Sequence, residues 1–177
     1  MLDSQKILLI VSYLLRYPDQ QWRSEFPSWK WEAENSVQHQ LLRESLIEFF
    51  EYVEETGLID FENQYVESFD FSKNTTLYMS TYELQGNGEQ SEQLVQFSAD
   101  FLENGYDLPH KETPDYLPAL LELLAAVDEG AMRKIFRRIL PYIEYLRQEL
   151  IKAELPYALL LDVVLAVANG LEESAHD

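Results

Sequence analysis

The sequence has 177 residues, of which 46% are apolar and 13% aromatic, so it suits one globular domain with a sizeable core and excludes a disordered chain. With 32 acidic and 13 basic residues the formal net charge is −19, which argues against nucleic-acid and anionic-lipid ligands. The absence of cysteine excludes disulfides, thiolate nucleophiles and zinc–thiolate sites.

The N-terminal segment predicts an amphipathic helix followed by an aromatic loop. Apolar residues at helical spacing favour a helix that has Asp3 or Ser4 as its N-cap, runs to about Arg16 and ends before Pro18. All three tryptophans lie in the polar segment 19–35. We expect this segment to be a loop that folds back onto the body of the protein, and an exposed aromatic contact site is the functional alternative.

Two further helices are predicted before residue 70. The first has Asn35 or Ser36 as its N-cap, carries apolar residues three and four positions apart, and ends at Gly57. The second covers residues 58–68.

The segment around Leu77 to Tyr82 is ambiguous. Its threonines and aromatic residues are typical of a strand, but no second strand is evident with which it could pair. A helix that covers Leu77, Tyr78 and Tyr82, with Asp70 or Ser72 as its N-cap, is therefore the preferred prediction.

The C-terminal half predicts four helical segments. One covers residues 90–104, the next ends at Val127, a long amphipathic segment is kinked near Pro141, and the last runs from Leu155–Pro156 to about Gly170. The predicted fold is therefore all-α: one compact bundle-like domain of seven to eight helices over residues 1–170, with a flexible acidic tail at 171–177.

The apolar runs indicate neither a secretory signal nor a membrane span. The N-terminal run lacks a basic lead and a cleavage site, and the run near the C-terminus is short and is interrupted by Asp162. We expect a cytoplasmic protein without direct membrane insertion.

No pattern in the sequence predicts catalysis. The histidines His39, His110 and His176 are scattered, and the Glu-x-x-His spacing of Glu173 and His176 occurs once, in the terminal tail. No phosphate-binding glycine loop and no nucleophile elbow is present. We therefore predict no enzyme, no cofactor and no metal. A helical enzyme or metal carrier that uses clustered carboxylates is the alternative.

A basic cluster stands out against the acidic composition. Arg133, Lys134, Arg137 and Arg138 fall on one face of a helix. This face either pairs with neighbouring acidic residues or forms a docking patch for an acidic partner surface.

The stretch "ETPDYLPALLELLAAV" carries two prolines at the entrance of an apolar helix. Thr113 is the predicted N-cap, with Pro114 at the first helical position and Asp115 in the first turn. Pro118 lacks the donor that would bond the Pro114 carbonyl, which leaves that oxygen able to accept another hydrogen bond. The stretch is either a rigid helix entrance or a grip for a cationic or hydrogen-bonding peptide.

Two blocks of sequence resemble the NarJ family. They are "NQYVESFDFSKNTTLYMSTYE" and "PDYLPALLELLA", and the first helix also fits in its ending, "LLRYPD". The resemblance covers roughly residues 7–127. The NarJ proteins, also called the nitrate reductase delta subunit, are molybdenum cofactor assembly chaperones. They are similar to the TorD and DmsD redox-enzyme maturation chaperones.

The resemblance implies an all-helical, non-catalytic, cytoplasmic protein, a monomer or weak homodimer. Its implied partner is the N-terminal segment of the respiratory nitrate reductase alpha subunit. The chaperone would hold that subunit until molybdenum cofactor is inserted and the complex docks on its membrane subunit. The alternatives are a sister chaperone for a DMSO or TMAO reductase type of molybdoenzyme, and a generic acidic scaffold.

The resemblance also implies a peptide-binding site. An amphipathic peptide helix would lie on the aromatic residues, and Asp70 and Asp115 would meet its basic residues. Many family members carry an Arg-Gly pair where this chain has Gln90-Ser91, so any anchoring by that arginine is done differently here. The residues carried over to this site are Asp70, Phe71, Tyr78, Tyr82, Pro114, Asp115, Tyr116 and Pro118.

Overall fold

The computed structural model describes residues 1–72, 74–84, 86 and 88–174, and over these ranges it contains eight α-helices, one short 3₁₀ helix and no strand. The all-α prediction is therefore confirmed. The elements are α1 (Asp3–Leu14), α2 (Gln20–Ser36), α3 (Gln40–Thr56), α4 (Leu58–Phe69), η1 (Met79–Thr81), α5 (Gln90–Glu103), α6 (Leu117–Ala126), α7 (Glu129–Lys152) and α8 (Ala158–Glu173).

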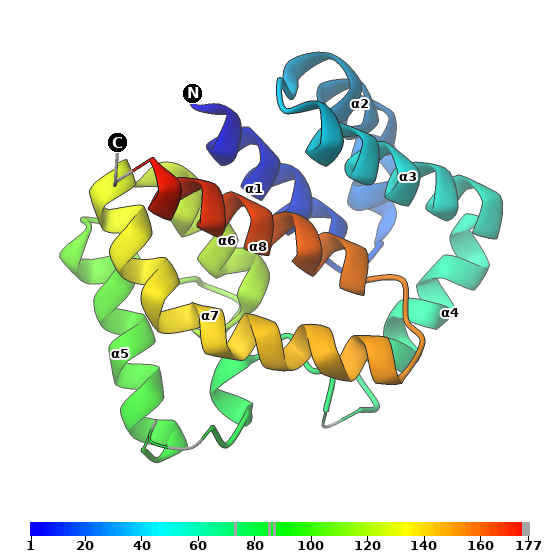
Figure 1. Cartoon of the computed structure of the whole chain (residues 1–177). Helices are drawn as coiled ribbons and strands as arrows, with labels where there is room; N and C mark the ends of the chain where they lie inside the picture. Colours follow the sequence, from blue (N-terminus) through cyan, green and yellow to red (C-terminus); the bar gives the residue numbers. More distant parts are fainter. Residues whose placement is uncertain (73, 85, 87, 175–177) are drawn as a thin grey trace.

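Helix α1 lies at the centre of the molecule. It packs against α2, α6 and α8, and α7 runs antiparallel along the other side of α8 (Figure 1). The apolar spacing of α1 explains this position, because Leu8, Val11, Leu14 and Leu15 are all fully buried. Helices α3 and α4 lie at one end of the molecule, and α5 lies across the other end, below α7 in the view of Figure 1.

Aromatic rings form the part of the core between α3, α4 and the start of α8. Tyr157 is fully buried, and its ring centroid lies 5.7 Å from that of Phe49, 6.1 Å from that of Phe61 and 4.6 Å from that of Phe69. Burial raises the pKa of Tyr157. Its hydroxyl oxygen has no hydrogen-bond partner among the described residues.

This buried hydroxyl gives a first testable prediction. Replacing Tyr157 by phenylalanine keeps the ring and removes a polar group that is desolvated without compensation, so we expect the free energy of unfolding to rise by about 1 kcal/mol. Urea denaturation followed by circular dichroism measures the change. Tyr65→Phe is the matched control, because the Tyr65 hydroxyl donates to the carbonyl of Leu15 at 2.8 Å and its loss should destabilise the protein. A destabilised Tyr157→Phe variant would contradict the prediction.

The tryptophan segment is helix α2, so the prediction of a loop was wrong. Asp19 caps the helix by accepting a hydrogen bond from the Trp22 N–H at 2.8 Å. The ring of Tyr13 on α1 stacks on Trp22 at 4.9 Å and on Trp29 at 5.0 Å. Because these two tryptophans are seven residues, or about two helical turns, apart, Tyr13 is wedged between them. This contact stabilises a helix whose own sequence is polar and contains Pro27.

Two predicted helix starts also differ. Asp3 does not cap α1; its carboxylate accepts hydrogen bonds from the backbone N–H groups of Gln38 at 2.8 Å and His39 at 2.9 Å. His39, and not Asn35 or Ser36, is the N-cap of α3. Asp3 thus joins the first turn of α1 to the turn between α2 and α3.

The segment that was predicted as a helix over Leu77, Tyr78 and Tyr82 contains only the η1 turn and one isolated antiparallel bridge, between Tyr78 and Tyr116. The following helix, α6, begins at Leu117 with Tyr116 as its N-cap. Thr113 and Pro114 therefore precede the helix, and Pro118 is the proline of its first turn.

The C-terminal pair of helices is present as predicted, but the ends of both helices differ. Asp128 caps α7 by accepting a hydrogen bond from the Ala131 N–H at 2.9 Å, and the helix continues through Pro141. Helix α8 continues past Gly170, and Leu171 is buried, so the first residues of the predicted tail belong to this helix. The end of that tail, residues 175–177, lies outside the described residues. Over the described ranges, no helix is both long and apolar enough to cross a membrane.

Candidate functional site

The bridge between Tyr78 and Tyr116 joins the two sequence blocks that suggested a function. The N–H of Met79 donates to the carbonyl of Asp115 at 3.0 Å, and the N–H of Leu117 donates to the carbonyl of Leu77 at 2.8 Å. Backbone pairing therefore fixes the entrance of α6 against the segment that follows α4.

Asp115 holds this junction from within. Its side chain is 1% exposed and accepts hydrogen bonds from the Ser80 N–H at 3.1 Å, the Ser80 hydroxyl at 2.6 Å and the Thr113 hydroxyl. Gln90 donates in turn to the Ser80 oxygen at 3.4 Å. Asp115 is thus a structural acceptor rather than a surface charge, and Gln90 ties the start of α5 to it through Ser80.

Tyr78 and Tyr116 form an aromatic pair next to the bridge. Their ring centroids lie 5.1 Å apart, and the Tyr78 hydroxyl donates to the Glu112 carboxylate. The Arg16 guanidinium lies 6.0 Å from the centre of the Tyr116 ring. Burial raises the pKa of both tyrosines, and the bond to Glu112 adds to the effect on Tyr78. Both phenols therefore stay protonated at physiological pH.

Two residues of the predicted site belong to the core. Tyr82 is buried, and its ring lies 4.8 Å from that of Tyr145 on α7. Pro118 is buried in the first turn of α6, and its carbonyl accepts a hydrogen bond from the Ser12 hydroxyl of α1 at 2.7 Å. Neither side chain faces an incoming ligand.

Asp70 and Phe71 lie at the surface just after α4. Phe71 is 80% exposed, and Asp70 is exposed as well. The pKa of Tyr17 is raised mainly by its hydrogen bond to Glu62, and that of Tyr116 mainly by burial. The negative charge of Asp70 lies close enough to both phenols to raise each pKa further. Asp70 therefore remains available to a cationic ligand that approaches Tyr116, and Pro114 is half-buried at the same junction.

A groove runs beside this junction. It consists of a hollow of about 570 Å³ between α1, α6 and the loop 106–112, and a hollow of about 500 Å³ between α1, α2 and α6. The two hollows share five lining residues, so we treat them as one surface and call it the central groove. The shared residues are Arg16, Lys111, Glu112, Tyr116 and Glu122.

Acidic side chains dominate the lining of the central groove. Asp19 and Glu25 contribute from one side, and Asp107, Glu112 and Glu122 from the other, against Arg16 and Lys111. Arg16 bonds Glu122 across α1 and α6 at 2.6 Å, with both side chains partly exposed, so the pair is weak and open to exchange. The central groove thus offers tyrosine and tryptophan faces beside a surplus of negative charge.

Sequence reasoning missed most of these lining residues. Arg16, Glu112 and Glu122 lie on three separate elements, and nothing in their local sequence marks them. The one available signal was the tryptophan segment, for which a contact site was the stated alternative. The structure divides its members: Trp22 is buried, Trp29 is half-buried in the groove wall and Trp31 is exposed.

The basic cluster on α7 is neutralised by acidic neighbours, which was the first of its two interpretations. Arg133 and Arg138 are partly buried, and Arg133 also donates to the carbonyl of Leu171 at 3.0 Å. A docking role for this face stays a prediction. The ion pairs are Arg133–Glu129 at 3.1 Å, Lys134–Glu103 at 3.7 Å, Arg137–Glu172 at 3.2 Å, and Arg138–Asp100.

No group of three or more histidine, aspartate or glutamate side chains within the described ranges is arranged to hold a metal ion. His176, whose spacing to Glu173 was noted in the sequence, lies outside those ranges.

Comparison with known proteins identifies the family. The profile described as "Nitrate reductase delta subunit" matches residues 34–160. The chain belongs to the nitrate reductase delta subunit family. The resemblance to the NarJ proteins is thereby confirmed, and the matched residues include both the Tyr78–Tyr116 bridge and the Asp115 network.

Curated relatives within the delta subunit family match over almost the whole chain. A Bacillus subtilis (strain 168) protein, named "Probable nitrate reductase molybdenum cofactor assembly chaperone NarJ", is 34% identical over 97% of this chain and 94% of its own length. The Escherichia coli (strain K12) protein named "Nitrate reductase molybdenum cofactor assembly chaperone NarJ" is 28% identical over 94% of this chain and 71% of its own length. The E. coli NarW protein, with a similar name, is 24% identical over 93% of this chain and 69% of its own length.

Proposed function

We propose that this chain is a cytoplasmic assembly chaperone of a respiratory nitrate reductase. In this proposal it binds the N-terminal segment of the alpha subunit in the central groove and holds the subunit competent for molybdenum cofactor insertion and membrane docking. It acts without catalysis and without a cofactor of its own, as a monomer or weak homodimer. The observation that carries the proposal is the acidic, aromatic groove beside the Tyr78–Tyr116 bridge, where the two blocks that resemble NarJ meet.

The groove is suited to a basic, amphipathic segment. The exposed parts of Tyr17 and Trp29 accept apolar side chains, while Glu112 and Glu122 accept a lysine or arginine from the partner. A basic residue of the peptide can replace Arg16 at Glu122, because that surface ion pair is partly exposed and weak. The overall charge of −19 accelerates the encounter with a cationic segment.

Calorimetric titration with a synthetic peptide of the alpha subunit's N-terminus tests the proposal. We expect saturable binding that weakens as salt rises, because part of the attraction is electrostatic. Glu122→Gln should weaken binding about three- to tenfold, since the variant loses a partner for the peptide's basic residue and leaves Arg16 unpaired in the groove.

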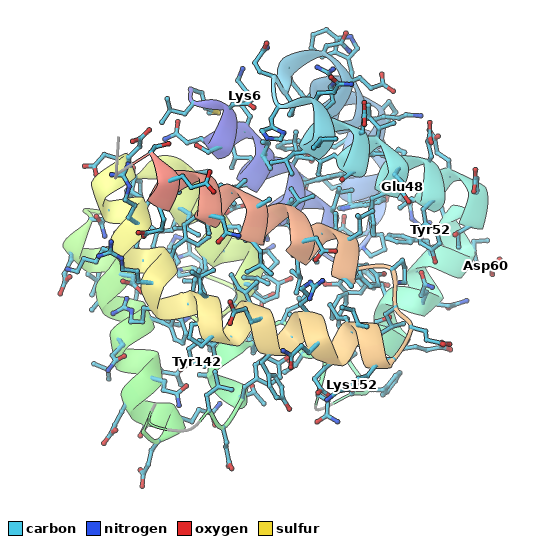
Figure 2. All side chains as sticks on the ribbon, viewed as in Figure 1. Lys6, Glu48, Tyr52, Asp60, Tyr142 and Lys152 are labelled. Carbon is cyan, nitrogen blue, oxygen red and sulfur yellow. The ribbon has the colours of Figure 1, made fainter. Side chains whose placement is uncertain are left out.

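Glu48→Gln is the matched control. It makes the same change of net charge on the outer face of α3, away from the central groove, and Figure 2 shows Glu48 there. Its affinity should stay within about twofold of the wild type. Absence of saturable binding to the wild-type chain would sink the proposal, and binding of a leader peptide from another molybdoenzyme instead would favour the sister-chaperone function. Equal losses in both variants would show a long-range charge effect and remove the groove as the site.

A further inference from the structure

A third hollow extends the central groove beyond the residues considered so far. It has a volume of about 680 Å³ and lies between the first half of α1 and the second half of α2. Its apolar lining includes Met1, Ile10 and Trp31, and we call it the tryptophan pocket. Trp31 is 57% exposed beside the other apolar residues of this hollow, so its indole is accessible to a partner.

The tryptophan pocket is continuous with the central groove. Leu9 on α1 and Trp29 on α2 line both of them. Trp29 is held in place by its stacking on Tyr13 at 5.0 Å, so the wall between the two hollows is rigid. A ligand that lies along α1 in the central groove therefore reaches the tryptophan pocket across Leu9 and Trp29, the two residues that the hollows share.

The two ends of this continuous surface differ in charge. The central groove has an acidic surplus, whereas the charged residues of the tryptophan pocket are one base, Lys6, and one acid, Glu32. Lys6 also donates to the carbonyl of Ser36 at 3.2 Å, and Figure 2 shows it on α1 beside the end of α2. One end therefore selects a basic side chain, and the other selects an apolar one.

The spacing of the two ends follows from α1 and the two residues after it. Lys6 on α1 lines the tryptophan pocket, and Arg16, two residues beyond the end of α1, lies in the central groove, ten residues further along the chain. Ten residues correspond to about 15 Å at the rise of an α-helix. A partner helix lying along α1 would therefore place its two anchoring side chains about three turns apart.

We propose that the tryptophan pocket is a second anchoring site for the same partner, and that it takes a large apolar side chain of the alpha subunit's N-terminal segment. This inference rests on the proposed function, and it adds a register: the apolar anchor lies about three helical turns from the basic residue that meets Glu122. The alpha subunit's N-terminal segment is thus recognised at both ends, by aromatic contact in the tryptophan pocket and by charge in the central groove.

The first test uses the exposed tryptophan. Trp31→Ala should fold normally, and it should weaken binding of the alpha-subunit peptide about five- to tenfold in calorimetry, as expected for loss of an aromatic anchor. Leu41→Ala is the matched control, since Leu41 is 67% exposed on α3 and lines none of the three hollows. Its affinity should stay within about twofold of the wild type.

A double-mutant cycle then assigns the register. Each large apolar residue of the peptide is replaced by alanine in turn, and every peptide is titrated into the wild-type chain and into Trp31→Ala. One replacement should weaken binding to the wild type and have little further effect on Trp31→Ala. The inference is overturned if the peptide binds the wild-type chain tightly and Trp31→Ala does not change the affinity. It is also overturned if the losses of affinity from Trp31→Ala and from each peptide substitution are additive for every peptide. Either result leaves the proposed function unaffected. No wild-type binding at all would remove both.

Discussion

Trp22→Ala is expected to lower the free energy of unfolding by about 3–5 kcal/mol, the range typical of large aromatic residues removed from a core. Trp22 is 3% exposed, stacks on Tyr13 and Phe61, and packs against the tilted ring of Phe26. Its indole N–H also donates to the carbonyl of Tyr13 at 2.8 Å. The variant loses this packing and this bond together, and with them much of what holds α2 on α1.

Urea denaturation followed by circular dichroism at the helical band measures this change. Trp22→Phe serves as a milder variant that still folds: it keeps an aromatic ring but loses the bond to the Tyr13 carbonyl, so it should cost about 1–2 kcal/mol. Trp31→Ala is the control on the same helix, and its exposed position should limit the loss to about 0.5 kcal/mol. Equal losses at positions 22 and 31 would contradict the stacked arrangement.

Asp115→Ala is the second variant with a large expected effect. The substitution removes the acceptor for the N–H and hydroxyl of Ser80 and for the hydroxyl of Thr113, and Ser80 is itself buried. Desolvated donors without a partner are costly, so we expect a loss of about 2–4 kcal/mol in the free energy of unfolding. Chemical denaturation checks the value.

The same position separates a structural role from direct contact with a ligand. Asp115→Asn keeps one acceptor oxygen without the charge, and it should cost about half as much stability as Asp115→Ala. Because the carboxylate is buried, Asp115→Asn should leave the salt dependence of peptide binding unchanged. Asp70→Asn, at an exposed position, should leave stability unchanged within about 0.5 kcal/mol. If the salt dependence of peptide binding falls only in Asp115→Asn, the Asp115 carboxylate contacts the peptide directly and its role is not only structural.

The sequence predicted the helical class and most helices, because strong amphipathic segments such as α3 and α7 carry their own periodic signal. Helix α2 lacks that signal. Its sequence is polar and contains Pro27, and it is stabilised by the Tyr13 ring, which lies on another helix. Local periodicity cannot report a contact of that kind.

The candidate site was predictable only in part, for a related reason. Tyr78, Tyr116 and Asp115 do meet, but through a single bridge pair. The segment that contains Tyr78 was expected to be a helix because no second strand was evident, and an isolated bridge needs none. Asp115 turned inward because Ser80 and Thr113 provide its hydrogen bonds. The groove walls come from α1, α2, α6 and the loop 106–112, and only the tertiary fold brings these together.

The Tyr78–Tyr116 bridge also closes a long excursion of the chain at its base. The chain leaves the bridge after Tyr82, forms α5 and returns to it at Glu112, which bonds Tyr78. Side chains join α5 to α7, where Tyr142 donates to Gln93 at 2.7 Å and Arg138 pairs with Asp100. Because the excursion is closed at its base, we expect the amide hydrogens of α5 to exchange with solvent in a local opening while those of α1 and α6 stay protected. In a chaperone built this way, α5 can open while α1 and α6, which line the central groove, keep their positions.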